Sequence, residues 1–187
     1  MSSQPDSTRR DQSRNTAPTT LRWIGVGAPT TIEGSQSVTV NPDTSEGSEG
    51  APEWLVTNGL GGYACGTMTG LVTRRFHGYL VAALPAPRGR TMMLNHLRAI
   101  ISTDKGRARL SEQPDPENLG EPLAALREFR LELGLPVWTF EHQGSVIEVR
   151  LIMPHRQNTV FIICKRLSGS GSVQMSFDPW IHFRPHE

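Results

Sequence analysis

EWLVTNGLGGYACGT, residues 53–67, and TRRFHGYLVAAL, residues 73–84, form the stretch of sequence that decides the fold. The first piece predicts a strand that ends in a glycine-dense turn. The second predicts a loop with paired arginines that leads into another strand. Between Trp54 and Thr103 the chain has no Asp or Glu, although it has five arginines there. This stretch therefore cannot supply carboxylate chemistry by itself.

Period-two alternation predicts further strands downstream. Residues 129–133 alternate apolar and charged side chains, which is the pattern of a strand with one buried face. Residues 137–142 and 146–153 flank Gln143-Gly144-Ser145 and predict a β-hairpin. Residues 158–166 and 172–177 flank the sequence SGSG and predict a second hairpin.

The remaining segments complete the predicted fold. Residues 78–84 are a continuous apolar run, typical of a strand that is buried on both faces. Residues 92–102 predict a strand, with a helix as the alternative for Asn95–Arg98, and residues 111–122 predict a loop. Only residues 123–128 have the composition of a short helix. Many short strands with glycine turns predict an all-β fold, an antiparallel β-sandwich.

Composition divides the chain at about residue 50. Residues 1–20 have almost no apolar side chains, and residues 41–52 read as a flexible acidic linker. We therefore expect a disordered tail and linker over residues 1–50, with possible short strands at 21–24 and 37–40. The folded domain is expected over residues 51–187, which is long enough to bury a substantial core.

Charge and cysteine content limit the classes of partner and compartment. The net charge of +1 lacks the basic excess of a dedicated nucleic-acid binder. No apolar run is long enough to span a membrane, and Arg9-Arg10 is not followed by the apolar region of an export signal. Two widely separated cysteines predict free thiols rather than a disulfide framework. We expect a cytoplasmic protein without nucleic-acid or membrane partners.

The glycine-dense turn matches the spacing of a dinucleotide fingerprint, G-x-G-x-x-A, over residues 59–64. That fingerprint needs a helix directly after it and an acid about 20 residues further on. The next residues, CGTMTG, are too rich in glycine and threonine to begin a helix, and no acid occurs before Asp104. We expect no nucleotide cofactor; these glycines more simply permit a tight turn between strands.

Other chemistry-bearing residues give weaker patterns. His182 and His186 have a spacing found among metal ligands, but Pro185 interrupts a helix and no other ligand cluster accompanies them, so we predict no metal site. The acids on residues 128–148 fit the solvent face of amphipathic strands better than a hydrolytic pair. The tryptophans fit a core better than a sugar-stacking platform. The paired arginines either fork onto a ligand or partner, or lie in a solvated loop with one arginine paired to an acid elsewhere.

Residues 53–94 resemble the N-terminal domain of bacterial and archaeal glycogen debranching enzymes. The resemblance rests on EWLVTNGLGGYACGT and on TRRFHGYLVAALPAPRGR, and it continues in the shorter stretches EFRL, residues 128–131, and PHRQNTV, residues 154–160. It implies a large, supersandwich-like β-sandwich of the kind that precedes an (α/α) barrel glycosidase domain. In that family the barrel carries the acid and base that hydrolyse α-1,6-glucosidic branches.

For this chain the resemblance implies a non-catalytic domain that docks such a barrel, in cis or in trans, and contacts α-glucan. It also implies that the chain is a fragment, a truncated product or half of a split enzyme, inactive alone. Our candidates for the interdomain or glucan-facing residues are Asn58, Arg74, Arg75 and His77.

Two positions depart from the family pattern. Phe76 stands where the family has tyrosine, and Pro185 follows Arg184 where the family has aspartate. The alternative hypothesis is a free-standing carbohydrate-binding module with the same sandwich. Such a module should expose Trp54, Trp138 or Trp180 on a flat face, whereas a docking domain should bury them and expose an apolar patch.

Overall fold

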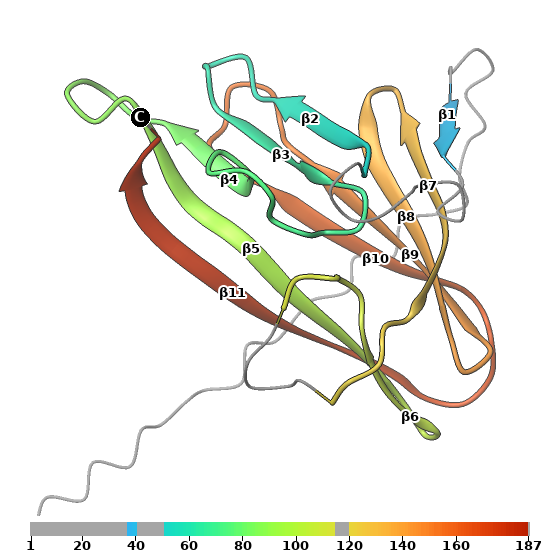
Figure 1. Cartoon of the computed structure of the whole chain (residues 1–187). Coiled ribbons are helices and arrows are strands. Elements are labelled where there is room, and N and C mark those ends of the chain that lie inside the picture. Colours follow the sequence, from blue (N-terminus) through green and yellow to red (C-terminus); the bar gives the residue numbers. More distant parts are fainter. Residues whose placement is uncertain (1–36, 41–50, 115–119, 187) are drawn as a thin grey trace, which may run out of the picture. The chain divides into compact units, whose positions relative to one another are not determined.

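A computed structural model of the chain describes residues 37–40, 51–114 and 120–186. All the regular secondary structure in these residues is β-strand, arranged in two antiparallel sheets (Figure 1). The predicted all-β antiparallel sandwich is thereby confirmed. Most of the predicted tail and linker, including the possible strand at residues 21–24, lies outside the described residues. Residues 37–40 form a strand.

The first sheet has five strands in the order β1-β7-β8-β9-β10. They are β1 (Ser37–Val40), β7 (Ala125–Glu132), β8 (Leu135–His142), β9 (Ser145–Ile152) and β10 (Phe161–Ser168). The second sheet has the order β11-β5-β4-β3-β2, and β6 pairs with β5 beside this path. Its strands are β2 (Glu53–Thr57), β3 (Tyr63–Thr67), β4 (Gly78–Ala83), β5 (Arg90–Thr103), β6 (Gly106–Arg109) and β11 (Val173–Pro185).

Tryptophans join the inner faces of the two sheets. The rings of Trp54 on β2 and Trp138 on β8 meet edge to face at 5.5 Å between centroids. Each indole donates to a backbone carbonyl, Trp54 to Thr67 and Trp138 to Met68. These two tryptophans are buried, as predicted for core residues, because each ring fills the space between sheets while its N–H finds an acceptor. Trp180 on β11 is half-buried and packs edge-on against His96.

The predicted hairpin around residues 143–145 is confirmed. β8 and β9 pair in register from His142↔Ser145 onward, so the loop consists of Gln143 and Gly144. Both loop residues have positive φ, 52° and 77°. Two-residue hairpin turns of this kind need positive φ at both positions, which explains the Gly.

The predicted second hairpin is wrong. β10 pairs with β9 in the first sheet, whereas β11 pairs with β5 in the second, so the intervening glycine segment carries the chain from one sheet to the other. A glycine-rich segment has the same sequence pattern whether it joins two paired strands or two different sheets, because glycines indicate only a local turn. The two strands also differ in length: β11 has 13 residues and pairs along most of the 14-residue β5, whereas β10 has 8 residues.

Two segments whose sequence is compatible with a helix form β-strands instead. The short helix expected over residues 123–128 is wrong, because residues 125–128 begin β7. The helical alternative for Asn95–Arg98 is wrong because these residues lie inside β5. Neighbouring strands supply the backbone hydrogen bonds at both places, which outweighs a weak local propensity. None of the described residues belongs to a helix long and apolar enough to cross a membrane.

Candidate functional site

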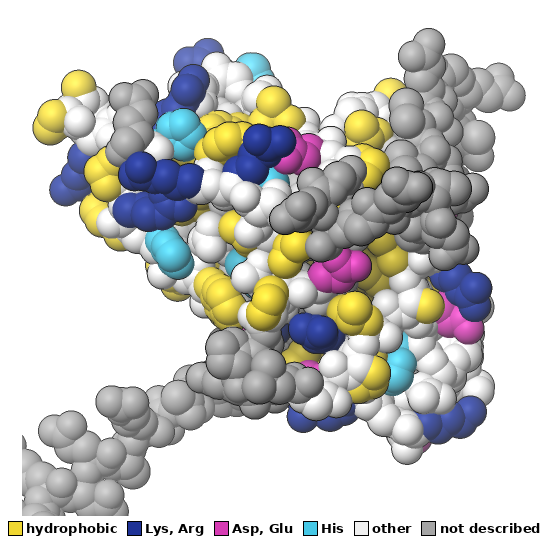
Figure 2. Space-filling model, viewed as in Figure 1, with side chains coloured by type: hydrophobic (Ala, Val, Ile, Leu, Met, Phe, Trp, Pro, Cys, Tyr) yellow, Lys and Arg dark blue, Asp and Glu magenta, His cyan; other side chains and the backbone are white. Residues whose placement is uncertain are grey.

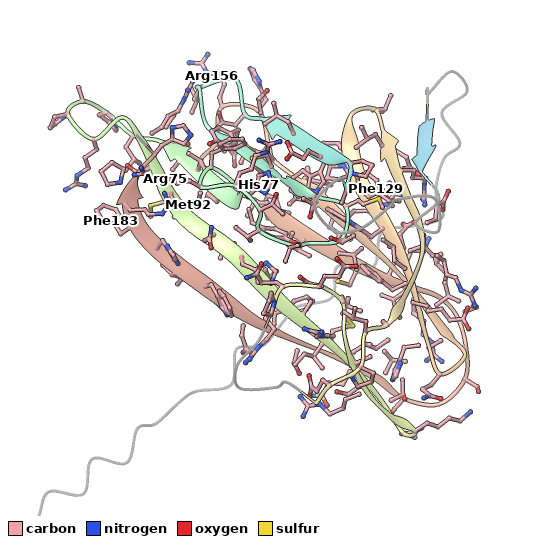
Figure 3. The ribbon with its side chains drawn as sticks, viewed as in Figure 1. Arg75, His77, Met92, Phe129, Arg156 and Phe183 are labelled. Carbon is pink, nitrogen blue, oxygen red and sulfur yellow. The ribbon has the colours of Figure 1, made fainter. Side chains whose placement is uncertain are left out.

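The sequence-predicted residues lie at one end of the second sheet, where the β2–β3 and β3–β4 loops meet the ends of β5 and β11. Arginine side chains gather on this part of the molecule among hydrophobic side chains, with few acidic ones between them (Figure 2). Arg75, His77 and Phe183 lie in this region in Figure 3. The site is therefore a face built from loops on a rigid sheet.

Asn58 is the anchor of the β2–β3 loop. Its side-chain oxygen accepts hydrogen bonds from the backbone N–H groups of Leu60 and Gly62, at 2.9 and 3.0 Å. Its amide nitrogen donates to the Gln157 carbonyl and to the Asn158 side chain, at 2.9 and 3.1 Å. Asn58 is fully buried, so this candidate residue organises the loop from below and offers no free group to a ligand.

The glycines of this loop are required by close approach and by backbone conformation. A Cβ on Gly62 would lie 2.7 Å from the Asn58 amide nitrogen and 2.9 Å from the Val81 carbonyl oxygen. Gly59 and Gly61 have φ of 75° and 95°, which other residues rarely adopt. The sequence GLGG thus forms a turn around the Asn58 side chain. This agrees with the prediction that these glycines permit a tight turn between strands.

His77 is buried at the end of the β3–β4 loop. Its Nδ1 accepts a hydrogen bond from the Thr73 N–H at 3.3 Å, so the neutral ring carries its proton on Nε2. Nε2 lies 3.4 Å from Glu53 Oε1. Burial lowers the pKa of His77; the Glu53 carboxylate opposes this shift and the nearby Arg74 adds to it. The imidazole is held neutral beneath the loop.

Arg74 and His77 meet at Glu53, an acid that sequence reasoning missed because it lies 21 residues before Arg74. Arg74 Nε donates to Glu53 Oε1 at 2.5 Å, and its guanidinium lies 5.8 Å from the Phe76 ring centre. The hydrogen bond from Arg74 lowers the pKa of Glu53. Arg74, one of the paired arginines, is therefore bound to an acid elsewhere in the chain. This pairing is one of the two interpretations of the loop that the sequence left open.

Arg75 extends from the same loop on the exposed side. Its carbonyl oxygen accepts a hydrogen bond of 2.6 Å from Arg184 Nη2 at the end of β11. This contact ties the loop to residues more than one hundred positions away. The structure thus brings Arg74, Arg75 and His77 together in one loop, and places Asn58 in the adjoining one.

An open groove of about 710 Å³ runs over the outer face of β2 and β3 beside these loops. Its floor includes the exposed side chain of Leu55 and the ring of Tyr63, and its walls include Phe76, Arg90 and His186. Outward-facing residues of a strand alternate with core residues, so the same alternation that buries Trp54 and Val56 presents Leu55 to the groove.

Carboxylates at two places test whether the described residues could perform glycoside hydrolysis. Glu132 and Glu148 lie together on the first sheet, but Arg130 and Arg150 each bond both of them. Although burial opposes it, these hydrogen bonds lower the pKa of both carboxyl groups. A glycosidase needs one carboxyl group whose pKa is raised so that it can donate a proton. Glu132, Glu148 and the Arg74-bound Glu53 are all held in the ionised form.

The fold and this face define a class of protein: an antiparallel β-sandwich domain whose polar loop residues Asn58, Arg74 and Arg75 bond to other residues of the domain. Residues 52–187 match the family described as glycogen debranching enzyme N terminal. The chain belongs to this family. No curated protein and no solved structure matches it.

Proposed function

We propose that this chain is a non-catalytic domain of a glycogen debranching enzyme that docks an (α/α) barrel glycosidase domain during glycogen breakdown. One observation supports docking beyond the family assignment. Trp54 and Trp138 are buried, while apolar side chains on the outer face and end of the second sheet are open to solvent. Leu55, Ile181 and Phe183 are 60%, 72% and 64% exposed. Ile181 and Phe183 lie two positions apart on β11, and exposed apolar side chains near one another are typical of an interaction surface.

Contact with α-glucan is the second part of the proposal. The groove beside the glycine loop is large enough for a small oligosaccharide, and it carries the Tyr63 ring, whose face can stack on a sugar. A cytoplasmic location completes the proposal; both cysteines are free, as expected in a reducing compartment.

The experiment that tests docking mixes the purified chain with the separately expressed (α/α) barrel of a full-length glycogen debranching enzyme. Association is measured by isothermal titration calorimetry and by sedimentation velocity. We expect a complex with one copy of each component. A concentration of about 100 μM is well above the dissociation constants of ordinary stable complexes. Absence of association at this concentration would therefore contradict docking.

The carbohydrate-module alternative predicts a different result. Co-sedimentation with glycogen should retain a free-standing module without any barrel. The docking proposal expects weak retention of the chain alone and stronger retention of the chain together with the barrel, because glucan contact then adds to the binding of the barrel. Equal and strong retention in both cases would favour the module.

A further inference from the structure

Three arginines and two phenylalanines form one continuous surface at the end of the second sheet. This surface, here the Arg–Phe surface, consists of Phe76, Arg88, Arg90, Phe183 and Arg184. Phe76 belongs to the β3–β4 loop, Arg88 to the β4–β5 connection and Arg90 to the start of β5. The last two belong to the end of β11. Figure 3 places Phe183 close to Arg75, the neighbour of Phe76.

Direct contacts and two adjoining hollows make the surface continuous. Arg184 Nη2 donates to the Arg75 carbonyl, which joins β11 to the loop that carries Phe76. The Arg88 guanidinium lies 5.7 Å from the Phe183 ring centre. Arg90 lines both the groove of about 710 Å³ and a second hollow of about 470 Å³, which is also lined by Arg88, Phe183 and Arg184.

The positive charge of this surface is not neutralised by the described residues. Arg90 Nε donates to the Gly61 carbonyl, and Arg184 donates to the Arg75 carbonyl, so both contacts are to neutral acceptors. The carboxylate nearest in the groove, Glu53, is bound by Arg74. Among the described residues, Arg184 Nη1 is buried and has no hydrogen-bond partner. With only neutral or aromatic partners among the described residues, Arg88, Arg90 and Arg184 favour a ligand rich in acceptors.

This chemistry distinguishes between classes of ligand. Sugar hydroxyls both donate and accept hydrogen bonds, whereas the guanidinium groups here only donate. Phe76 and Phe183 are 41% and 64% exposed, and neither ring has a polar end. Arginine and aromatic side chains are the residues enriched in protein–protein interfaces, where Arg pairs with carboxylates. The surface therefore fits a protein segment better than a neutral glucan.

We propose that the Arg–Phe surface is the docking surface for the (α/α) barrel, and that the barrel presents there Asp or Glu side chains around an apolar side chain. This inference rests on the proposed function and adds the surface and the chemistry of the partner. The apolar side chain of the barrel would pack between Phe76 and Phe183. The carboxylates of the barrel would form ion pairs with the arginines of this surface.

The test uses substitutions on this surface and matched controls elsewhere. Arg88→Glu reverses one charge in an exposed loop, and its control is Lys105→Glu in the exposed β5–β6 turn. Phe183→Ala removes one exposed ring, and its control is Phe161→Ala on β10, which is 51% exposed. Affinity for the isolated barrel is measured by calorimetry at low and high NaCl concentration, and each variant is first checked for an unchanged melting temperature.

We expect Arg88→Glu and Phe183→Ala each to weaken binding by about tenfold or more, as central interface residues do. Binding of the unsubstituted chain should weaken as NaCl rises, and Arg88→Glu should reduce that salt dependence. Both controls should bind like the unsubstituted chain.

Three other results would overturn the inference in different ways. If the chain binds the barrel and the Arg–Phe variants match their controls, docking stands but uses another surface. If the unsubstituted chain does not bind the barrel, the proposed function fails together with the surface. If a single-stranded oligonucleotide binds the unsubstituted chain more tightly than the barrel and Arg88→Glu abolishes that binding, the surface serves phosphate groups.

Discussion

At the scale of single residues, the sequence motif of this family is largely a device for building loops. Asn58 closes the glycine turn and reaches across to the segment after β9, where Asn158 in turn bonds both backbone groups of Ala83. A short polar side chain buried between two loops can hold them together because every one of its hydrogen-bonding atoms is used. Polar residues in a recognisable motif thus need not touch a ligand.

Substitution of Asn58 by Ala should lower the free energy of unfolding by about 3 kcal/mol, because it leaves several buried groups without hydrogen bonds. Urea denaturation measures the change. Gln174→Ala is the control, because this exposed amide lies on β11; it should change stability by less than about 0.5 kcal/mol. A loss as small as that of the control would show that water replaces the Asn58 contacts.

His77 gives the fold a pH dependence with a defined sign. Burial lowers the pKa of His77 below its usual 6.5, so below pH 6.5 the unfolded chain binds more protons than the folded chain. The stability should therefore fall as the pH falls below 6.5, by up to about 1.4 kcal/mol per pH unit. His77→Gln should flatten this dependence, measured by urea denaturation between about pH 7.5 and 5.

Exposed His182 on β11 provides the comparison for this experiment. His182→Gln should change the free energy of unfolding by less than about 0.5 kcal/mol, as expected of an exposed position. Glu53 does not obscure the result. Its pKa is lowered from 4.5, so its contribution to the stability is lost only at a more acidic pH than the range measured. An unchanged slope in His77→Gln would show that another group titrates.

At the scale of elements, the outer face of the first sheet is held by charges that cross three strands. Arg130 on β7 bonds Glu128 and Glu132 on its own strand and Glu148 on β9, and Arg150 returns from β9 to Glu132. The Glu148 side chain is 9% exposed and that of Arg130 15%. Alternation along the strands identifies these residues as outward-facing. Only the strand order, with β8 between β7 and β9, brings the charges of β7 and β9 close to one another.

Arg130→Ala should lower the free energy of unfolding by about 3 kcal/mol, because it leaves the nearly buried Glu148 carboxylate with only one arginine. Arg127→Ala on the same strand is the matched control. Arg127 pairs with Glu141 at the surface, where its side chain is 59% exposed, so its loss should cost less than about 1 kcal/mol. Thermal and urea unfolding of both variants measure the difference, and equal losses would contradict the network.

At the scale of the whole described domain, both thiols report on global unfolding. Cys65 lies on β3, in the second sheet, and Cys164 on β10, in the first. Burial raises the pKa of each thiol to about 11. Few thiolates are therefore present at neutral pH, and the thiolate is the reactive form.

Reaction of the native chain with Ellman's reagent at about pH 8 should be at least tenfold slower than in concentrated urea, for both cysteines. Absorbance of the released thiol measures the rate, and Cys65→Ser and Cys164→Ser assign it to each position. Fast reaction of Cys164 alone in the native chain would show that β10, an edge strand, opens independently of the second sheet.

The sequence by itself determined the all-β class, most of the strands and the family, but it did not predict β6 and it predicted a helix where β7 begins. Trp54 and Trp138 are predicted in the core because large aromatic side chains on strands fit a core better than a sugar platform. The Gln143-Gly144 turn carries its own conformational signal, because it depends on neighbours in the chain. Only the tertiary structure decided that β11 joins β5, that Glu53 receives Arg74, and that Arg184 reaches Arg75. Such contacts depend on which strand edges meet in space, and no local pattern encodes the partner of a strand edge or of a charge.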